Sequence, residues 1–231
     1  MTVKDTVTDL NGNRLVESSS APVAVDTENP EVTIADDQSG IAFDGANTVE
    51  YTLTFSEAVQ SVTESDLTVT GAESFSVAHT ADTDTATVTV TVADDSMANV
   101  SIEVNDSIVD IAGNPLIEAV DNLQTVDTVN PSTVGAPAVS DVLVTDTDDV
   151  TTLTVSFGFD EDMDQGIDPA VTFDPAVAST LTSQAGRWTD AQTYVVDAVV
   201  ADAGVDADQV TIDITGAYDV AGNLQVDHTA T

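Results

Sequence analysis

Hydrophobic and polar residues alternate with a period of two along much of this chain. Residues 85–92 read Thr-Ala-Thr-Val-Thr-Val-Thr-Val. Successive side chains of a strand point to opposite faces, so this pattern predicts a strand with one buried face. The same alternation predicts strands at the apolar positions Val49, Tyr51, Leu53 and Phe55, then Val100, Ile102 and Val104, then Leu153, Val155, Phe157 and Phe159, and then Val210, Ile212 and Ile214. Clusters of Gly, Asp, Asn and Pro separate these strands, and the chain has no sustained apolar stripe of helical period. We therefore expect an all-β chain built of β-sandwiches.

The chain also repeats its own sequence. Residues 3–30 recur as residues 104–131 at a constant offset of 101, and the motif Asp-x-Ala-Gly-Asn that ends at Asn114 occurs again, ending at Asn223. A unit of about 100 residues is long enough to enclose its own hydrophobic core. The repeat therefore predicts tandem domains.

The domain boundaries are expected at two linkers, residues 25–30 and 126–131, which both end in Asn-Pro. We expect residues 1–30 to be the closing segment and linker of a preceding repeat, and residues 31–129 and 130–231 to form one sandwich each. A proline removes a backbone donor and favours extended geometry in the residue before it. The linkers should therefore be short and stiff.

Charge and composition limit the partners. The chain has 42 acidic and 3 basic residues, a formal net charge of −39. This charge argues against nucleic acid and anionic membranes as partners, and it favours cations. Repulsion of this size also opposes a compact fold unless counterions or bound metal offset it. The chain has no cysteine and no apolar run of membrane-spanning length, so neither disulfides nor direct membrane insertion is expected.

Several motifs resemble those of a known family. They are the Val-Asp-Thr-x-x-Pro linkers, Phe-Ser-Glu-Ala-Val at residues 55–59, Ser-Asp-Leu-Thr-Val-Thr at residues 65–70, and Asp-x-Ala-Gly-Asn before the last strand. Together they resemble the bacterial immunoglobulin-like (Ig-like) tandem repeats of large secreted adhesins and cell-surface proteins. The resemblance implies tandem immunoglobulin-like β-sandwich domains joined by short proline-containing linkers. It also implies an extracellular or cell-surface stalk, often stiffened by calcium at the domain junctions.

Candidate calcium ligands at the first junction follow from the usual order of strands in such a sandwich. The second strand is expected to end at Phe55, which places Glu57 in a loop at the N-terminal pole. Asp110 opens the last hairpin loop at the same pole, and Asp26 lies in the incoming linker. We expect these three carboxylates to converge. Calcium takes 6–8 oxygens from carboxylates, carbonyls and water, so the cluster is a candidate calcium site.

The second junction repeats the trio as Asp127, Glu161 and Asp219. Further oxygen donors are expected from Asp160, Asp162 and Asp164. Two other interpretations stay open. Asp-x-Ala-Gly-Asn can be a turn alone, in which the aspartate bonds backbone amides and the glycine supplies a positive φ. The carboxylates can also belong to a diffuse acidic surface of the halophile type. Asn114 and Asn223 are interpreted as turn residues rather than ligands.

Catalysis is not expected. His79 and His228 lie far from any nucleophile motif, and the chain has neither a Gly-x-Ser-x-Gly elbow nor a phosphate loop. Two function classes remain, a passive extender in a stalk and a subunit of a self-assembling extracellular filament, with a ligand-binding module as a third. The expected partners are calcium ions and either neighbouring Ig-like domains of the same array or identical subunits. Nucleic acid is not an expected partner.

The filament class rests on the two ends of the chain. Residues 14–26 are expected to be a closing strand without a sandwich body, and fewer residues follow Asn223 than the 13 that lead from Asn114 to Asp127. An unpaired sheet edge is a template for strand addition. In this interpretation the N-terminal segment of one molecule completes the last sandwich of the next by donor-strand exchange. The other interpretation is an excerpt from a longer array.

Overall fold

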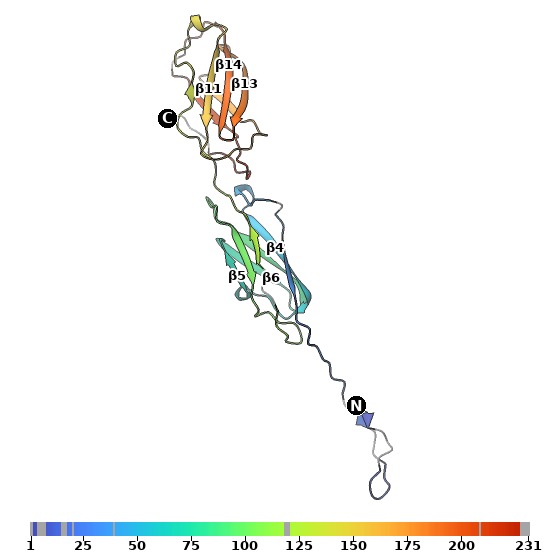
Figure 1. Ribbon diagram of the computed structural model, residues 1–231. Coiled ribbons are helices and arrows are strands. Elements are labelled where there is room, and N and C mark those ends of the chain that lie inside the picture. Colours follow the sequence, from blue (N-terminus) through green and yellow to red (C-terminus); the bar gives the residue numbers. More distant parts are fainter. Residues whose placement is uncertain are drawn as a thin grey trace.

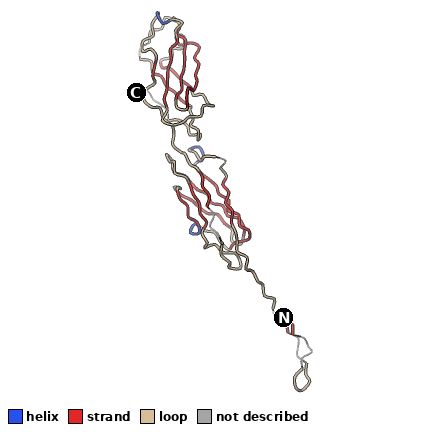
Figure 2. The backbone as a smooth tube through the Cα atoms, in the orientation of Figure 1, coloured by secondary structure: helices blue, strands red, loops and turns tan. Residues whose placement is uncertain are grey.

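The structure is a computed structural model that describes residues 2–3, 8–14, 18–19, 21–38, 40–117, 121–207 and 209–226. Within these ranges the regular elements are β-strands and short 3-10 helices, and all pairs of named strands are antiparallel. The predicted all-β class is therefore confirmed. Figures 1 and 2 show two β-rich units that lie end to end, with the N-terminal segment extending away from them. None of the described helices has the length and apolar character needed to cross a bilayer.

The first unit is a sandwich of two sheets. One sheet has the spatial order β3 (Val32–Asp36), β4 (Thr48–Val59), β7 (Thr83–Thr91) and β6 (Ser74–His79). The other has the order β5 (Leu67–Thr70), β8 (Val100–Val104) and β9 (Asp121–Gln124). Two 3-10 helices lie in its loops, η1 (Asp44–Ala46) and η2 (Glu64–Asp66).

The core of the first sandwich follows the predicted alternation. Leu53 on β4, Val88 on β7 and Ile102 on β8 are fully buried, whereas Thr52 and Thr54 on either side of Leu53 face solvent. Burial of one such aliphatic side chain contributes roughly 1.5–3 kcal/mol. These inward-facing side chains of the two sheets belong to one cluster, which holds the sheets together.

The second unit has the same two-sheet plan. One sheet has the order β10 (Ala138–Val139), β11 (Thr152–Gly158), β14 (Thr193–Val200) and β13 (Leu181–Asp190). The other pairs β12 (Ala170–Asp174) with β15 (Thr211–Thr215), and η3 (Asp146–Asp148) lies in a loop. Its buried cluster extends from Leu153 to Ala217 and is separate from the cluster of the first unit, which extends from Val32 to Val126.

Among the described residues, those before Val32 belong to neither buried cluster. β1 (Thr2–Val3) pairs with β2 (Ser18–Ser19), and residues 21–31 belong to no strand. Residues 15–17 and 20 of the predicted closing strand lie outside the described residues. Val25 is 82% exposed, whereas Val126, its equivalent 101 residues later, is 2% exposed and pairs with Ala42. This valine of the repeat is therefore exposed in the first copy and buried in the second copy, where the strands of the first sandwich surround it.

Candidate metal centres

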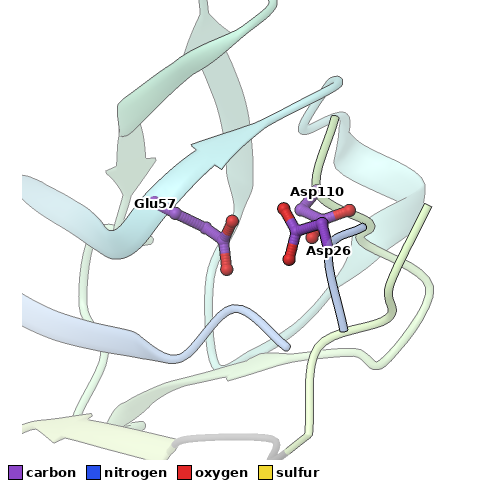
Figure 3. Close-up of side chains that lie close together, drawn as sticks. All are labelled: Asp26, Glu57 and Asp110. Carbon is purple, nitrogen blue, oxygen red and sulfur yellow. The ribbon is translucent and has the colours of Figure 1, made fainter. Parts of the chain in front are cut away.

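The carboxylates of the first predicted trio converge in the structure. Asp26, Glu57 and Asp110 each offer one oxygen, and these oxygens all lie within 4.8 Å of one another. Figure 3 shows the three carboxyl groups facing a common space. Asp110 is fully buried, Glu57 is partly buried and Asp26 is exposed. The linker, strand β4 and the loop after β8 therefore each supply one acid.

The second predicted trio converges in the same way. Asp127, Glu161 and Asp219 each offer one oxygen within 4.8 Å of the others. Asp219 is 1% exposed, and the other two side chains are partly buried. Both junctions thus combine one linker aspartate with a glutamate and an aspartate of the sandwich that follows the linker.

Strand pairing sets the distance between the glutamate and the buried aspartate. Val59, two residues after Glu57, forms an antiparallel bridge with Asp110. Met163 stands two residues after the second glutamate and forms the equivalent bridge with Asp219. Residues separated by two positions on a strand share a face. Glu57 belongs to β4, whereas Glu161 lies in a bend before its bridge residue. In both sandwiches the bridge two residues after the glutamate lies at the buried aspartate, and the two carboxylates are close together.

One part of the sequence argument was wrong. Glu57 was expected in a loop after Phe55, but β4 continues to Val59. The strand continues because the Ser56 N–H donates to the Glu31 carbonyl at 2.9 Å, although its register against β7 shifts after Thr54. Glu57 still reaches the N-terminal pole, because the end of this longer strand lies there.

The turn around Asp110 orders this carboxylate. Its Oδ1 accepts the N–H groups of Gly113 at 2.6 Å and Asn114 at 2.8 Å, and its Oδ2 accepts the Asn114 side-chain amide at 2.8 Å. Gly113 has a φ of +99°, a conformation that favours glycine. Burial raises the pKa of Asp110, but these hydrogen bonds outweigh it and lower the net pKa. The turn interpretation therefore describes the structure, and it is compatible with the cluster because Oδ2 keeps a second lone pair.

Two further turns have the same geometry. Asp219 Oδ1 accepts the N–H groups of Gly222 at 2.6 Å and Asn223 at 2.9 Å. Asp9 Oδ1 accepts the Asn13 N–H at 2.9 Å, but Asp9 is exposed. Within the described residues, no carboxylate trio includes Asp9. The turn alone therefore does not assemble a cluster, which also needs the glutamate and the linker acid.

The linker aspartates are ordered by their own backbone. Asp26 Oδ1 accepts the Glu28 N–H and Asp127 Oδ1 accepts the Val129 N–H, both at 3.2 Å. The Asp127 N–H also donates to the Ala42 carbonyl of the first sandwich at 2.9 Å. Asp127 is therefore attached to the first sandwich by its backbone, while its carboxylate lies with two acids of the second.

Burial and crowded negative charge raise the pKa of both glutamates. Burial, followed by the charges of Asp110 and Asp26, raises the pKa of Glu57. Burial, followed by the charges of Asp219 and neighbouring acids, raises the pKa of Glu161 from 4.5 to about 7. Negative charges close together disfavour ionisation, and a cation among them reverses the effect. Three carboxylates at this spacing can therefore bind a hard divalent cation, which prefers oxygen ligands.

The additional donors expected at the second junction lie outside its trio. The two oxygens of Asp160 accept the Ser132 N–H at 2.8 Å and the Ser132 hydroxyl at 2.6 Å. Asp164 accepts the Gly166 N–H at 2.9 Å. Neither these two carboxylates nor that of Asp162 belongs to the cluster within 4.8 Å. The prediction of these three residues as further ligands therefore has no support in the geometry.

Sequence reasoning missed two asparagines at the second junction. Asn130 Oδ1 is buried and accepts no hydrogen bond from the described residues, and a buried acceptor of this kind calls for a partner such as water or an ion. Asn223 Oδ1 accepts the Asp44 N–H of the first sandwich at 2.7 Å. The Asn-Pro linker signalled only a boundary, and nothing in the motif distinguishes Asn223 from Asn114. No sequence signal could therefore have found either role.

Comparison with known families identifies the first sandwich. Residues 26–127 match the model of the bacterial Ig-like domain, so the match contains the whole first trio. A search of curated proteins gave no match. Domains of this family are typical of surface or extracellular proteins, where they have structural roles. Residues 26–127 therefore match the bacterial Ig-like domain family, and the antiparallel sandwich that they form is consistent with this match.

Proposed function

We propose that this chain is an extender, or stalk, region of a secreted or cell-surface adhesin, stiffened by calcium at its domain junctions. The observation that carries the proposal is the same carboxylate trio at both junctions, with one acid from the linker and two from the following sandwich. A cation held by such a trio joins the linker to the sandwich. The role is mechanical and involves no catalysis.

The second junction supports this role in detail. The backbone of Asp127 is bonded to Ala42 of the first sandwich, and the Val226 N–H donates to the Pro131 carbonyl at the other end of the linker, at 2.9 Å. Residues 127–131 are therefore attached at both ends. A cation between Asp127, Glu161 and Asp219 adds a third attachment at the centre. This attachment limits bending of the linker.

Charge and donor chemistry favour calcium over other cations. The two trios bring together six carboxylates of a chain with a net charge of −39, and a divalent ion at each site offsets the local repulsion. Calcium accepts 6–8 oxygens in irregular geometry, whereas magnesium requires a near-ideal octahedron. Calcium also accepts amide oxygens, and Asn130 Oδ1, in the linker that carries Asp127, is buried without a hydrogen-bond partner among the described residues.

Titration calorimetry and small-angle scattering of metal-stripped protein test the proposal. We expect calcium to bind at two sites, to raise the melting temperature and to convert a flexible particle into a stiff rod. The double variant Glu57→Gln with Glu161→Gln should bind calcium much more weakly, and it should lose the rise in melting temperature and the stiffening. The control Glu50→Gln with Glu103→Gln removes the same charge from two exposed strand positions and should behave like the wild type. Stabilisation by sodium chloride equal to that by calcium, with no binding heat, would instead support the diffuse acidic surface.

A second candidate function, the self-assembling filament, is favoured by a groove in the second sandwich. The groove has a volume of about 430 Å³ and is lined mainly by apolar side chains, including Val139 on β10, Phe173 on β12 and Ile212 on β15. In the first sandwich, β9 pairs with β8 and Val126 packs against the same core. Among the described residues, no strand has the position of β9 in the second sandwich. A strand from another molecule could pair there.

Light scattering decides between the two candidates. In the filament, deletion of residues 1–30 should abolish polymers formed by the full chain, because the donated strand is lost. A deleted protein that polymerises as before, or a full chain that stays monomeric at all concentrations with or without calcium, would refute the filament. Both results leave the extender in place.

A further inference from the structure

Asn223 connects three separate parts of the second junction. Its side-chain Nδ2 donates to Asp219 Oδ2 at 2.7 Å and to the Asp127 carbonyl at 3.0 Å. Its Oδ1 accepts the Asp44 N–H at 2.7 Å. The three partners belong to the turn that carries the buried acid, to the linker and to helix η1 of the first sandwich. Asn223 is itself 1% exposed.

These contacts require an asparagine in one orientation. Two of the partners accept hydrogen bonds and the third donates one, so the amide nitrogen must face Asp219 and Asp127 while the oxygen faces Asp44. The Asp44 N–H begins a 3-10 helix and therefore has no acceptor within that helix. An aspartate in place of Asn223 would offer a second negative oxygen to Asp219 instead of a donor.

An aromatic contact lies beside these hydrogen bonds. A Cβ atom placed on Gly222 would lie 3.5 Å from Cδ2 of Phe43. Gly222 also has a φ of +105°. The ring of Phe43, which precedes Asp44, therefore lies against the backbone of the turn that Asn223 ends. The first sandwich thus contacts this turn through one side-chain ring and one backbone N–H.

The equivalent turn of the first sandwich makes no such contact. The Asn114 side chain donates to Asp110 Oδ2 at 2.8 Å, which repeats the bond between Asn223 and Asp219. Within the described residues, the side-chain bonds of Asn114 stay in its own turn, and no heavy atom lies within 4 Å of a Cβ built on Gly113. Asn114 is therefore a natural control, because it has the turn geometry without the contact between sandwiches.

We propose that Asn223 is the positioning residue that fixes the first sandwich on the carboxylate cluster of the second. Hydrogen bonds of the Asn223 amide connect the Asp219 turn and the linker to η1 of the first sandwich. A cation in the cluster therefore fixes the orientation between the two sandwiches. This inference rests on the proposed calcium function. It adds a residue that is not a cation ligand. Asn223 shares with Asn114 the support of a buried aspartate, and its additional effect is on the orientation between the sandwiches.

The absence of native cysteines allows the orientation to be measured directly. Thr52→Cys on β4 and Ala185→Cys on β13 place one exposed label on each sandwich for single-molecule energy transfer. In the labelled chain, saturating calcium should narrow the distribution of transfer efficiencies. Asn223→Ala should lose this narrowing, and Asn114→Ala should retain it. Calorimetry should show that Asn223→Ala weakens calcium at the second cluster by the same factor as Asn114→Ala weakens it at the first.

A second variant distinguishes loss of the contact between the sandwiches from local unfolding of the turn. Phe43→Ala leaves the turn of Asp219 intact and removes the ring from the other side, so it should also reduce the calcium-dependent narrowing. A narrow distribution in Asn223→Ala with calcium still bound would overturn the proposal while leaving the calcium function standing. A labelled parent chain that binds no calcium would overturn the calcium function, and the coupling with it.

Discussion

The raised pKa of Glu161 makes calcium binding at the second junction depend on pH. The perturbation is a change of pH between 6 and 8, a range in which ordinary glutamates stay ionised. Burial and the surrounding carboxylates raise the pKa of Glu161 to about 7. Calcium binds the ionised form, so binding must displace whatever proton the side chain carries.

The magnitude follows from this pKa. With a pKa of about 7, Glu161 is about half protonated at pH 7, so one calcium ion should release about half a proton there. About nine tenths of the side chain is ionised at pH 8 and about one tenth at pH 6. The apparent affinity of this site should therefore be roughly tenfold weaker at pH 6 than at pH 8.

Calorimetry in two buffers of different ionisation enthalpy measures both quantities. Glu57→Gln serves as the background, because it disables the first trio and leaves the second site to be measured alone. In that background, Glu161→Gln is the matched control, and its remaining weak binding should not vary between pH 6 and 8. Equal affinity at pH 6 and 8 in the parent, with binding heat that is the same in both buffers, would refute the reasoning.

The remaining predictions concern stability. In chelator, the folded-state pKa of Glu161 lies above its usual 4.5, so the folded state favours the protonated side chain. The stability that this side chain contributes is therefore complete below about pH 4.5 and is lost as the pH rises through about 7. Glu161→Gln should therefore stabilise the metal-free protein at pH 8, by on the order of 2 kcal/mol after allowance for solvent screening, and urea unfolding with and without chelator measures this. Asp219→Ala should cost about 1–3 kcal/mol even in chelator, because it removes the acceptor of two backbone N–H groups in a buried turn, whereas Asp9→Ala in the exposed copy should have a much smaller effect. Equal losses for these two variants would contradict the account of the turn. Leu53→Ala, at a fully buried position, should cost about 2–5 kcal/mol in the same assay, and a loss below about 1 kcal/mol would place Leu53 outside the core.

Much of the fold could be predicted because strand pairing and burial leave a local signal. The alternation around Leu53 and Ile102 predicts which side chains face inward, and both are fully buried. Strand ends were less predictable. β4 continues past Phe55 to Val59 because a long-range backbone bond from Ser56 supports it, and such a bond has no local signature.

The candidate site was predictable to a similar extent. The repeated motif and the expected order of strands brought Asp110 and Glu57 to one pole, and the structure places both with Asp26. The expected role of Asp160 has no support in the geometry, because this carboxylate lies outside the cluster and accepts two bonds from Ser132 instead. In so acidic a chain, residue type alone does not show which carboxylates are engaged elsewhere. The positions of the carboxylate oxygens in the folded chain decide that.

The sequence by itself determined the strand pattern, the repeat and the identity of the six acids at the two junctions. These features depend on local chemistry, namely the period of two, the turn residues and the spacing of like motifs. Only the tertiary structure shows which of the three similar turns of the described residues lie in a carboxylate trio. Asp9, Asp110 and Asp219 make nearly the same local bonds, but only the last two meet a glutamate and a linker acid. It also decided that Asn223 contacts the neighbouring sandwich while Asn114 does not, because that contact depends on which surface lies opposite the turn.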